Sequence, residues 1–169
     1  MIRKGKRYGR PKKLYEKSRI EEENILVARF GLKNKREIWK TLAKVSYYRH
    51  RAKALAKSSS GEQEVLFGKL RSLGLKANTI ADVLALSIED LLRRRLPTII
   101  AQRGLAQTVR QARQMVVHKN VRINGNVVNI PSYLVSLAEE SQITVKALKQ
   151  PITKTKSEDS ESIPEEAGK

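Results

Sequence analysis

The sequence predicts an α+β fold, in which a mostly helical N-terminal region precedes a small domain of two helices, a β-hairpin and additional short strands. Three observations predict it. Apolar residues recur about every 3.6 residues between positions 37 and 57. Pairs of residues that can cap helices occur three times within the next stretch of chain. Asn124-Gly125 stands between residues that alternate in polarity, as in a two-residue hairpin.

The helical region begins with a predicted helix over residues 37–57. Its apolar positions, Ile38 and Val45 among them, share one face, and Trp39 beside them is expected in the core. The run at 58–61, Ser-Ser-Ser-Gly, breaks this helix. Several short helices should follow, each started by a Ser or Thr whose box partner comes three residues later. These pairs are Ser60 with Gln63, Thr79 with Asp82, and Ser87 with Asp90.

The second region starts near Pro97, which suits the first turn of a helix better than its interior. We therefore expect a helix near 95–103 that buries Leu96, Ile99 and Ile100 and stops at Gly104.

The next helix should begin at Thr108, with Gln111 as box partner, and place Arg110 and Arg113 together on one face. His118 to Asn120 end it, with Asn120 in the left-handed turn.

A hairpin is expected next, in which Val121 and Ile123 point one way and Arg122 the other. Its returning strand should cover 126–130, and a further strand should cover 143–146.

Charge is distributed unevenly along the 169 residues, whose formal net charge is +18. Residues 1–57 hold 19 Lys and Arg against 5 Asp and Glu, whereas residues 150–169 carry a net negative charge. Between Leu91 and Ala138 there are eight basic residues and no acidic one, which is not typical of a salt-bridged face. So basic a chain makes most sense beside a polyanion, and nucleic acid is the first candidate.

The two ends of the chain are expected to lie outside the packed core. The first 13 residues form a predicted basic arm that orders on its partner, where Tyr8 could stack on a base, while the last residues form a predicted disordered acidic tail. The cations of the arm are Arg3, Lys4, Lys6, Arg7, Arg10, Lys12 and Lys13.

Several kinds of site are excluded by composition. The chain has no cysteine and only two histidines, far apart, so we expect no metal and no cofactor. No apolar run is long enough to span a membrane, and no apolar stretch follows the basic N-terminus as in a signal peptide. A cytoplasmic protein is the expectation.

A family resemblance is carried by the segment RRLPTIIAQRGLAQTVRQARQMVVHKNVRINGNVVNIPSYLV. It resembles the alpha-L RNA-binding domain named after small-subunit ribosomal protein four. Together with SIEDLLRRRL and the basic start YGRPKKLYEKSRIEEE, the likeness to the archaeal and eukaryotic branch of that family covers about residues 3–149. The family usually has an acid at Arg93, a polar residue at Pro97 and glycine at Lys119, so this chain departs from it at three positions.

The resemblance implies a primary binder of small-subunit ribosomal RNA, at a junction in the 5′ domain, that supports subunit assembly and translation. It also implies neighbouring small-subunit proteins, notably universal protein five, and proximity to messenger RNA near its entry path. Carried over onto this chain, the family's RNA-facing positions are Arg95, Arg103, Thr108, Arg110, Gln111, Arg113, Lys119, Arg122 and Asn124. Thr108 and Gln111 could serve only as caps.

Further RNA contacts are expected from Arg94, and from Arg49 and Arg51 beside Tyr47 and Tyr48. One of these two tyrosines should belong to the core instead. The expected division of the chain is a basic arm and extension (1–36), a helical domain (37–93), the alpha-L domain (94–149) and the acidic tail (150–169).

Three other functions compete with this one. An enzyme with an appended alpha-L domain would need a separate catalytic domain, for which no motif is visible. An assembly factor of the same architecture, binding pre-ribosomal RNA or a small nucleolar RNA, differs little in sequence chemistry. A protein of membrane surfaces would need bulky apolar anchors, for which only the 37–57 helix is a candidate.

Overall fold

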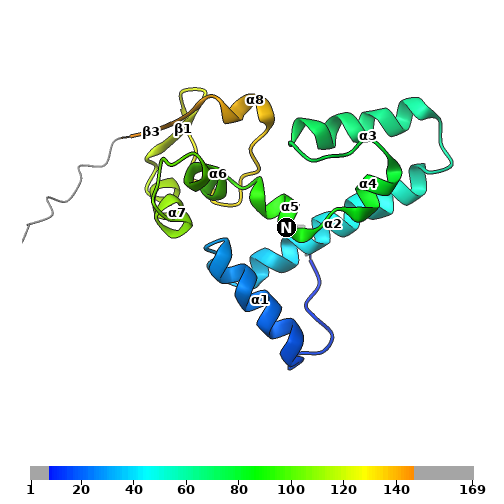
Figure 1. The fold of residues 1–169 in the computed structure, drawn as a ribbon, viewed down its shortest axis with the longest axis horizontal. Helices are drawn as coiled ribbons and strands as arrows, with labels where there is room; N and C mark the ends of the chain where they lie inside the picture. Colours follow the sequence, from blue (N-terminus) through cyan, green and yellow to red (C-terminus); the bar gives the residue numbers. More distant parts are fainter. Residues whose placement is uncertain (1–7, 147–169) are drawn as a thin grey trace, which may run out of the picture.

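The computed structural model describes residues 8–146, and its fold is α+β (Figure 1). Five helices form the first region and three helices with a small antiparallel sheet form the second. In chain order these elements are α1 (Lys17–Arg29), α2 (Arg36–Leu55), α3 (Ser60–Ser72), α4 (Ile80–Ala85), α5 (Ile88–Arg93), α6 (Leu96–Gln102), α7 (Val109–Val117), β1 (Val121–Ile123), β2 (Asn126–Val127), α8 (Leu137–Glu140) and β3 (Ile143–Val145).

Helix α2 organises the first region, as its apolar spacing predicted. Val45 and Ala52 on this helix are fully buried against Leu70 of α3 and Val83 of α4. Tyr48 joins the same core, whereas Tyr47 is exposed, so the expectation that one of the pair is a core residue is confirmed.

Of the three capping boxes predicted for the helical region, two are present, and the one between Ser60 and Gln63 is wrong. Thr79 and Ser87 each accept a hydrogen bond from the backbone N–H three residues on, and the aspartate there accepts one in return. Helix α3 begins instead after Ser59, without a side-chain cap. The side-chain amide of Gln63 donates to the carbonyl of Leu55, the last residue of α2, and to that of Ser58 just beyond the helix.

Helix α1 was not predicted, because its sequence is polar and shows no clear apolar stripe. It is held to α2 by Glu23, whose carboxylate accepts hydrogen bonds from Nε1 of Trp39 (2.9 Å) and from Arg19 (2.7 Å). Burial raises the pKa of Glu23, but the bonds from Trp39 and Arg19 outweigh it and leave the pKa below its ordinary value. The following turn buries Phe30 and Leu32 against α2 and α5.

The second region has its own core, formed between α6, α7 and the sheet. Pro97 lies in the first turn of α6, Leu96, Ile99 and Ile100 are buried, and Gly104 ends the helix at φ +72°, all as predicted. On α7, Ala112, Met115 and Val116 face this core.

The sheet has the order β2-β1-β3, with both neighbouring pairs antiparallel. Asn124 (φ +52°) and Gly125 (φ +80°) form the predicted two-residue hairpin turn, whose conformation fits type I′. Val121 and Ile123 are buried and Arg122 is exposed, which confirms the predicted alternation.

Three local predictions need correction. The returning strand ends at Val127 rather than at residue 130, because the chain leaves the sheet to form a turn in which the N–H of Tyr133 donates to the carbonyl of Ile130. Lys119, not Asn120, adopts the left-handed conformation after α7. The short helix α8, with a capping box between Ser136 and Glu139, was not predicted.

Within the second region, the segment after the hairpin runs beside the start of α6. Leu134 forms an isolated antiparallel β-bridge with Arg95, and the N–H of Leu96 donates to the carbonyl of Tyr133. Leu134 also packs against the core of the first region. Within residues 8–146, no helix is both long enough and apolar enough to cross a bilayer.

Candidate nucleic-acid interface

Three of the eight cations between Leu91 and Ala138 are exposed and make no ion pair within the described part of the chain. Arg110 lies in the first turn of α7, Lys119 just after its end, and Arg122 on the outer side of β1. Their positions follow from local structure, since the buried side chains of α7 and β1 force these neighbours outward. They are available to bind an anion.

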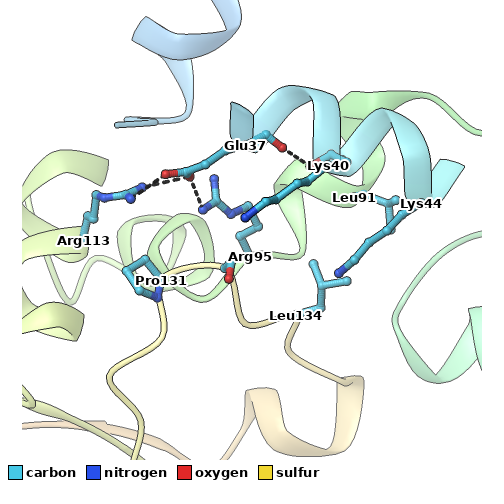
Figure 2. A pocket seen from close by; sticks show the side chains of 10 residues that line it. Glu37, Lys40, Lys44, Leu91, Arg95, Arg113, Pro131 and Leu134 are labelled. Carbon is cyan, nitrogen blue, oxygen red and sulfur yellow. Dashed lines mark hydrogen bonds and ion pairs between the residues drawn. The ribbon is translucent and has the colours of Figure 1, made fainter. Parts of the chain in front are cut away.

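Arg95 and Arg113 are arranged differently, because both bind the carboxylate of Glu37 on α2 (Figure 2). Nη2 of Arg95 donates to Oε2 of Glu37 at 2.6 Å. Arg113 binds the same carboxylate through both oxygens, Nη2 to Oε1 at 2.6 Å and Nη1 to Oε2 at 3.1 Å. We call these three residues the Glu37 cluster. They line a cavity of about 230 Å³ together with Lys40 and Pro131.

Electrostatics within the Glu37 cluster are strong because the groups are shielded from solvent. Burial by itself raises the pKa of Glu37, but the hydrogen bond from Arg113 and the charge of Arg95 more than compensate, so the pKa lies below its ordinary value. Only 6% of the Arg95 side chain is exposed. Its guanidinium therefore has little surface left for a second anion.

Arg94, the neighbour of Arg95, turns to the opposite side of the chain. Its guanidinium donates to Glu140 of α8 at 2.9 Å and to the carbonyl of Val135 at 3.0 Å. Gly74 (φ +74°), at the end of α3, lies so close that a Cβ there would come within 3.0 Å of the Arg94 guanidinium.

The prediction that the acid-free segment is not salt-bridged is therefore wrong for five of its eight cations, Arg93, Arg94, Arg95, Arg103 and Arg113. The physical reason is that their carboxylates come from outside the segment. Glu37 lies far upstream on α2, while Glu89 and Glu140 flank the segment at its two ends. The contact between Arg103 and Glu140, at 3.9 Å, is the loosest of the five pairs.

Thr108 and Gln111 are engaged in capping α7. The hydroxyl of Thr108 accepts from the N–H of Gln111 at 3.2 Å, and the side-chain carbonyl of Gln111 accepts from the N–H of Gln107 at 2.9 Å. The first bond of the predicted capping box is therefore present. In the second, Gln111 accepts from the N–H of Gln107 instead of from the N–H of Thr108. Asn124 is exposed in the hairpin turn.

On α2, the two expected arginines lie on the exposed surface but have internal partners. Arg49 donates to the carbonyl of Leu86 at 2.7 Å, which ties α2 to the turn between α4 and α5. Arg51 donates to the hydroxyl of Tyr47 at 3.1 Å.

Of the predicted arm, Arg10, Lys12 and Lys13 are described and exposed. Tyr8 packs at a tilt against Trp39, with ring centroids 6.4 Å apart, and Lys40 lies 5.8 Å from the Tyr8 ring. Arg3, Lys4, Lys6 and Arg7, like the acidic tail, lie outside the described residues.

Comparison with known proteins decides the family. Residues 94–141 match the model of the S4 domain. The chain is 42% identical over 144 residues to "Small ribosomal subunit protein uS4" of Methanothermobacter thermautotrophicus, an alignment that covers 82% of this chain and 84% of that protein. Proteins of the same name from Methanococcus aeolicus (41% identical, 84% of each chain) and Picrophilus torridus (40%, 82% of this chain and 81% of that one) are similar over the same extent.

The chain belongs to the uS4 family. The predicted resemblance is thereby confirmed, and the second region of the fold is its S4 domain. Lys119 is one of the positions where the chain departs from the family's pattern. It keeps the left-handed conformation, with a φ of +62°, that glycine adopts without strain.

Glu37 is a residue of the candidate site that local sequence patterns did not reveal. It lies 58 positions from Arg95 and 76 from Arg113, so no local pattern connects them. In the sequence, a glutamate in the first turn of a helix is ordinarily explained by its favourable interaction with the positive end of the helix dipole.

Proposed function

We infer that the chain is a constituent of the small ribosomal subunit and binds ribosomal RNA through its S4 domain. The observation that carries this inference is the similarity of at least 40% over more than four-fifths of the chain to proteins named for that subunit. Exposed cations on the S4 domain support it, since folded RNA is recognised largely through phosphates and shape.

The RNA contacts are proposed to begin with Arg110, Lys119 and Arg122. All three are exposed. Arg110 on α7 and Arg122 on β1 carry guanidinium groups, which bind phosphate through two hydrogen bonds, and Lys119 in the turn after α7 adds a point charge. The S4-domain positions that join them are Arg103 and Asn124, and those of the first region are Arg49, Arg51, Arg10, Lys12 and Lys13, with Arg3, Lys4, Lys6 and Arg7 preceding them.

The remaining candidates are assigned to shaping the surface rather than to touching RNA. Arg94, Arg95 and Arg113 each bind a carboxylate, and Thr108 and Gln111 cap α7. Losing any of them is expected to act on RNA binding through the fold.

Finer aspects of the proposal are supported by the family resemblance. They are binding at the 5′-domain junction early in assembly, contact with universal protein five, and proximity to messenger RNA at its entry path. The role is structural and not catalytic.

Separate buried clusters in residues 45–91 and 96–143 support the proposed division of the chain into domains near residue 94. A third cluster, around Phe30 and Ile38, indicates that part of segment 1–36 belongs with the helical region.

The proposal is tested by removing the three exposed cations together, as Arg110→Ala, Lys119→Ala and Arg122→Ala. Binding to a transcript of the small-subunit RNA 5′ domain should weaken, and the slope of log affinity against log salt should fall by about 2 to 3, as expected for three lost phosphate contacts. A matched control removes three exposed lysines of the helical region, Lys57, Lys69 and Lys76. Equal losses in both triple variants would contradict a specific role for the S4-domain cations.

Assembly into the particle is tested separately by sedimentation. A structural constituent stays with mature small subunits at moderate salt, whereas an assembly factor is released. Recovery of the chain only in free fractions would overturn the proposed role in the mature subunit.

A further inference from the structure

We propose that Glu37 is a positioning residue that holds the S4 domain at a fixed orientation to α2, and so sets the spacing of RNA-contacting cations on the two regions. The proposal rests on the proposed function, since it concerns how that RNA surface is prepared. The Glu37 cluster is the contact that carries it, because one carboxylate joins α2 to two separate places in the S4 domain.

The Glu37 cluster fixes two parts of the S4 domain to α2, unlike an ion pair on the surface, and we call this connection the joint. Arg95 immediately precedes α6, and Arg113 lies within α7, so both helices of the S4 domain are anchored to the same side chain. Figure 2 shows the two guanidiniums converging on the carboxylate from separate segments of the chain. Bidentate pairing with Arg113 restricts rotation as well as distance.

Burial makes the cluster strong and also costly to break. The exposed fractions of the Glu37 and Arg113 side chains are 17% and 20%. Two guanidiniums held this close repel each other, and the carboxylate between them is what offsets the repulsion. Removing the charge of Glu37 leaves two like charges facing each other in a partly desolvated site, so the S4 domain should move away from α2.

Helices α2 and α7, which Glu37 and Arg113 join, each also carry a cation proposed to touch RNA. Helix α7 presents Arg110 one turn before Arg113, and α2 presents Arg51 further along the helix than Glu37. Because each helix is rigid, fixing Glu37 to Arg113 also fixes the separation of these exposed cations. Without that joint, the contacts with RNA can still form, but binding must first order the two regions relative to each other.

An opposite role for Glu37 leads to the opposite expectation. In that alternative, Arg95 and Arg113 bind RNA phosphates, and Glu37 competes with the phosphates for them in the free protein. Removing the charge of Glu37 would then release both arginines and tighten RNA binding. The sign of the effect therefore separates positioning from direct contact. The near-complete burial of Arg95 favours positioning.

The experiment measures the affinity of Glu37→Gln for the 5′-domain transcript over a range of salt concentrations. We expect affinity to fall roughly 2- to 30-fold, the size of an indirect coupling effect, with an unchanged salt slope because the bound complex keeps all its phosphate contacts. The matched control is Glu64→Gln, which removes the same charge from an exposed pair with Arg71 and should bind like the unmodified chain. Unchanged or tighter binding by Glu37→Gln overturns the proposal.

A double-mutant cycle gives the second measurement. Under positioning, Arg113→Gln also weakens binding without changing the salt slope, and the double variant loses less than the sum of the two single losses, because both substitutions act on the same joint. Under direct contact, Arg113→Gln alone lowers the salt slope by about 1. If thermal melting shows that Glu37→Gln is unfolded at the assay temperature, Glu37→Asp is measured with the same two outcomes. Failure of the unmodified chain to bind the transcript overturns the proposed function itself and not only this joint.

Discussion

Replacing Lys119 with glycine should stabilise the folded protein, although Lys119 is proposed to contact RNA. Its φ of +62° lies in the left-handed region, where an L-residue with a Cβ is strained by about 1 to 2 kcal/mol. Glycine removes this strain but loses about 0.5 to 1 kcal/mol through the greater freedom of the unfolded chain. Lys119→Gly is therefore expected to raise the free energy of unfolding by roughly 0.5 to 1 kcal/mol, since no ion pair of Lys119 is present within residues 8–146.

Two measurements on the same variant should move in opposite directions. The melting temperature should rise by roughly 1 to 4 °C for a chain of this size. Affinity for the 5′-domain transcript should fall, and the salt slope should drop by about 0.9 as one phosphate contact disappears.

The control for this prediction is Lys119→Ala, which removes the charge but keeps the Cβ. It should match the glycine variant in RNA binding and show no gain in melting temperature. Equal melting temperatures for the glycine and alanine variants would refute the argument from backbone strain.

Three further predictions concern single features of the structure. Arg122→Ala should lower the salt slope of RNA binding by about 1 while changing stability by less than about 0.5 kcal/mol in a denaturant titration, because this side chain is exposed on β1. Thr108→Ala should destabilise the chain by about 1 kcal/mol through loss of the α7 cap, and Thr108→Ser, which keeps the hydroxyl, should restore most of it. The depressed pKa of Glu37 means that its contribution to stability is present above the unfolded value near 4.5 and is lost as pH falls through the lower folded value. Melting curves of the unmodified chain and Glu37→Gln should therefore converge on acidification below about pH 4.5, and a constant difference would contradict this linkage.

Local sequence patterns predicted much of the fold because the responsible interactions span only a few residues. The caps at Thr79 and Ser87 join residues three apart, the Asn124-Gly125 turn needs two positive φ values in succession, and Pro97 acts on its own turn of helix. Helix α1 was not predicted because the interactions that stabilise it join residues far apart in the sequence.

The stability of α1 comes from contacts with distant residues. The bond from Trp39 to Glu23 and the burial of the turn after α1 against Leu92 of α5 are not encoded in the spacing of its own residues.

By itself, the sequence determined the family, the α+β class, the basic character of the chain and the outward direction of Arg110 and Arg122. Which cations remain available was decided only by the tertiary structure. Arg95 and Arg113 look free in the sequence because no acidic residue lies within four positions of either, yet the fold brings Glu37 from α2 within 2.6 Å of both. Charge interactions depend on distance in space, and the distance along the chain between a cation and its carboxylate has no bearing on their strength once the chain is folded.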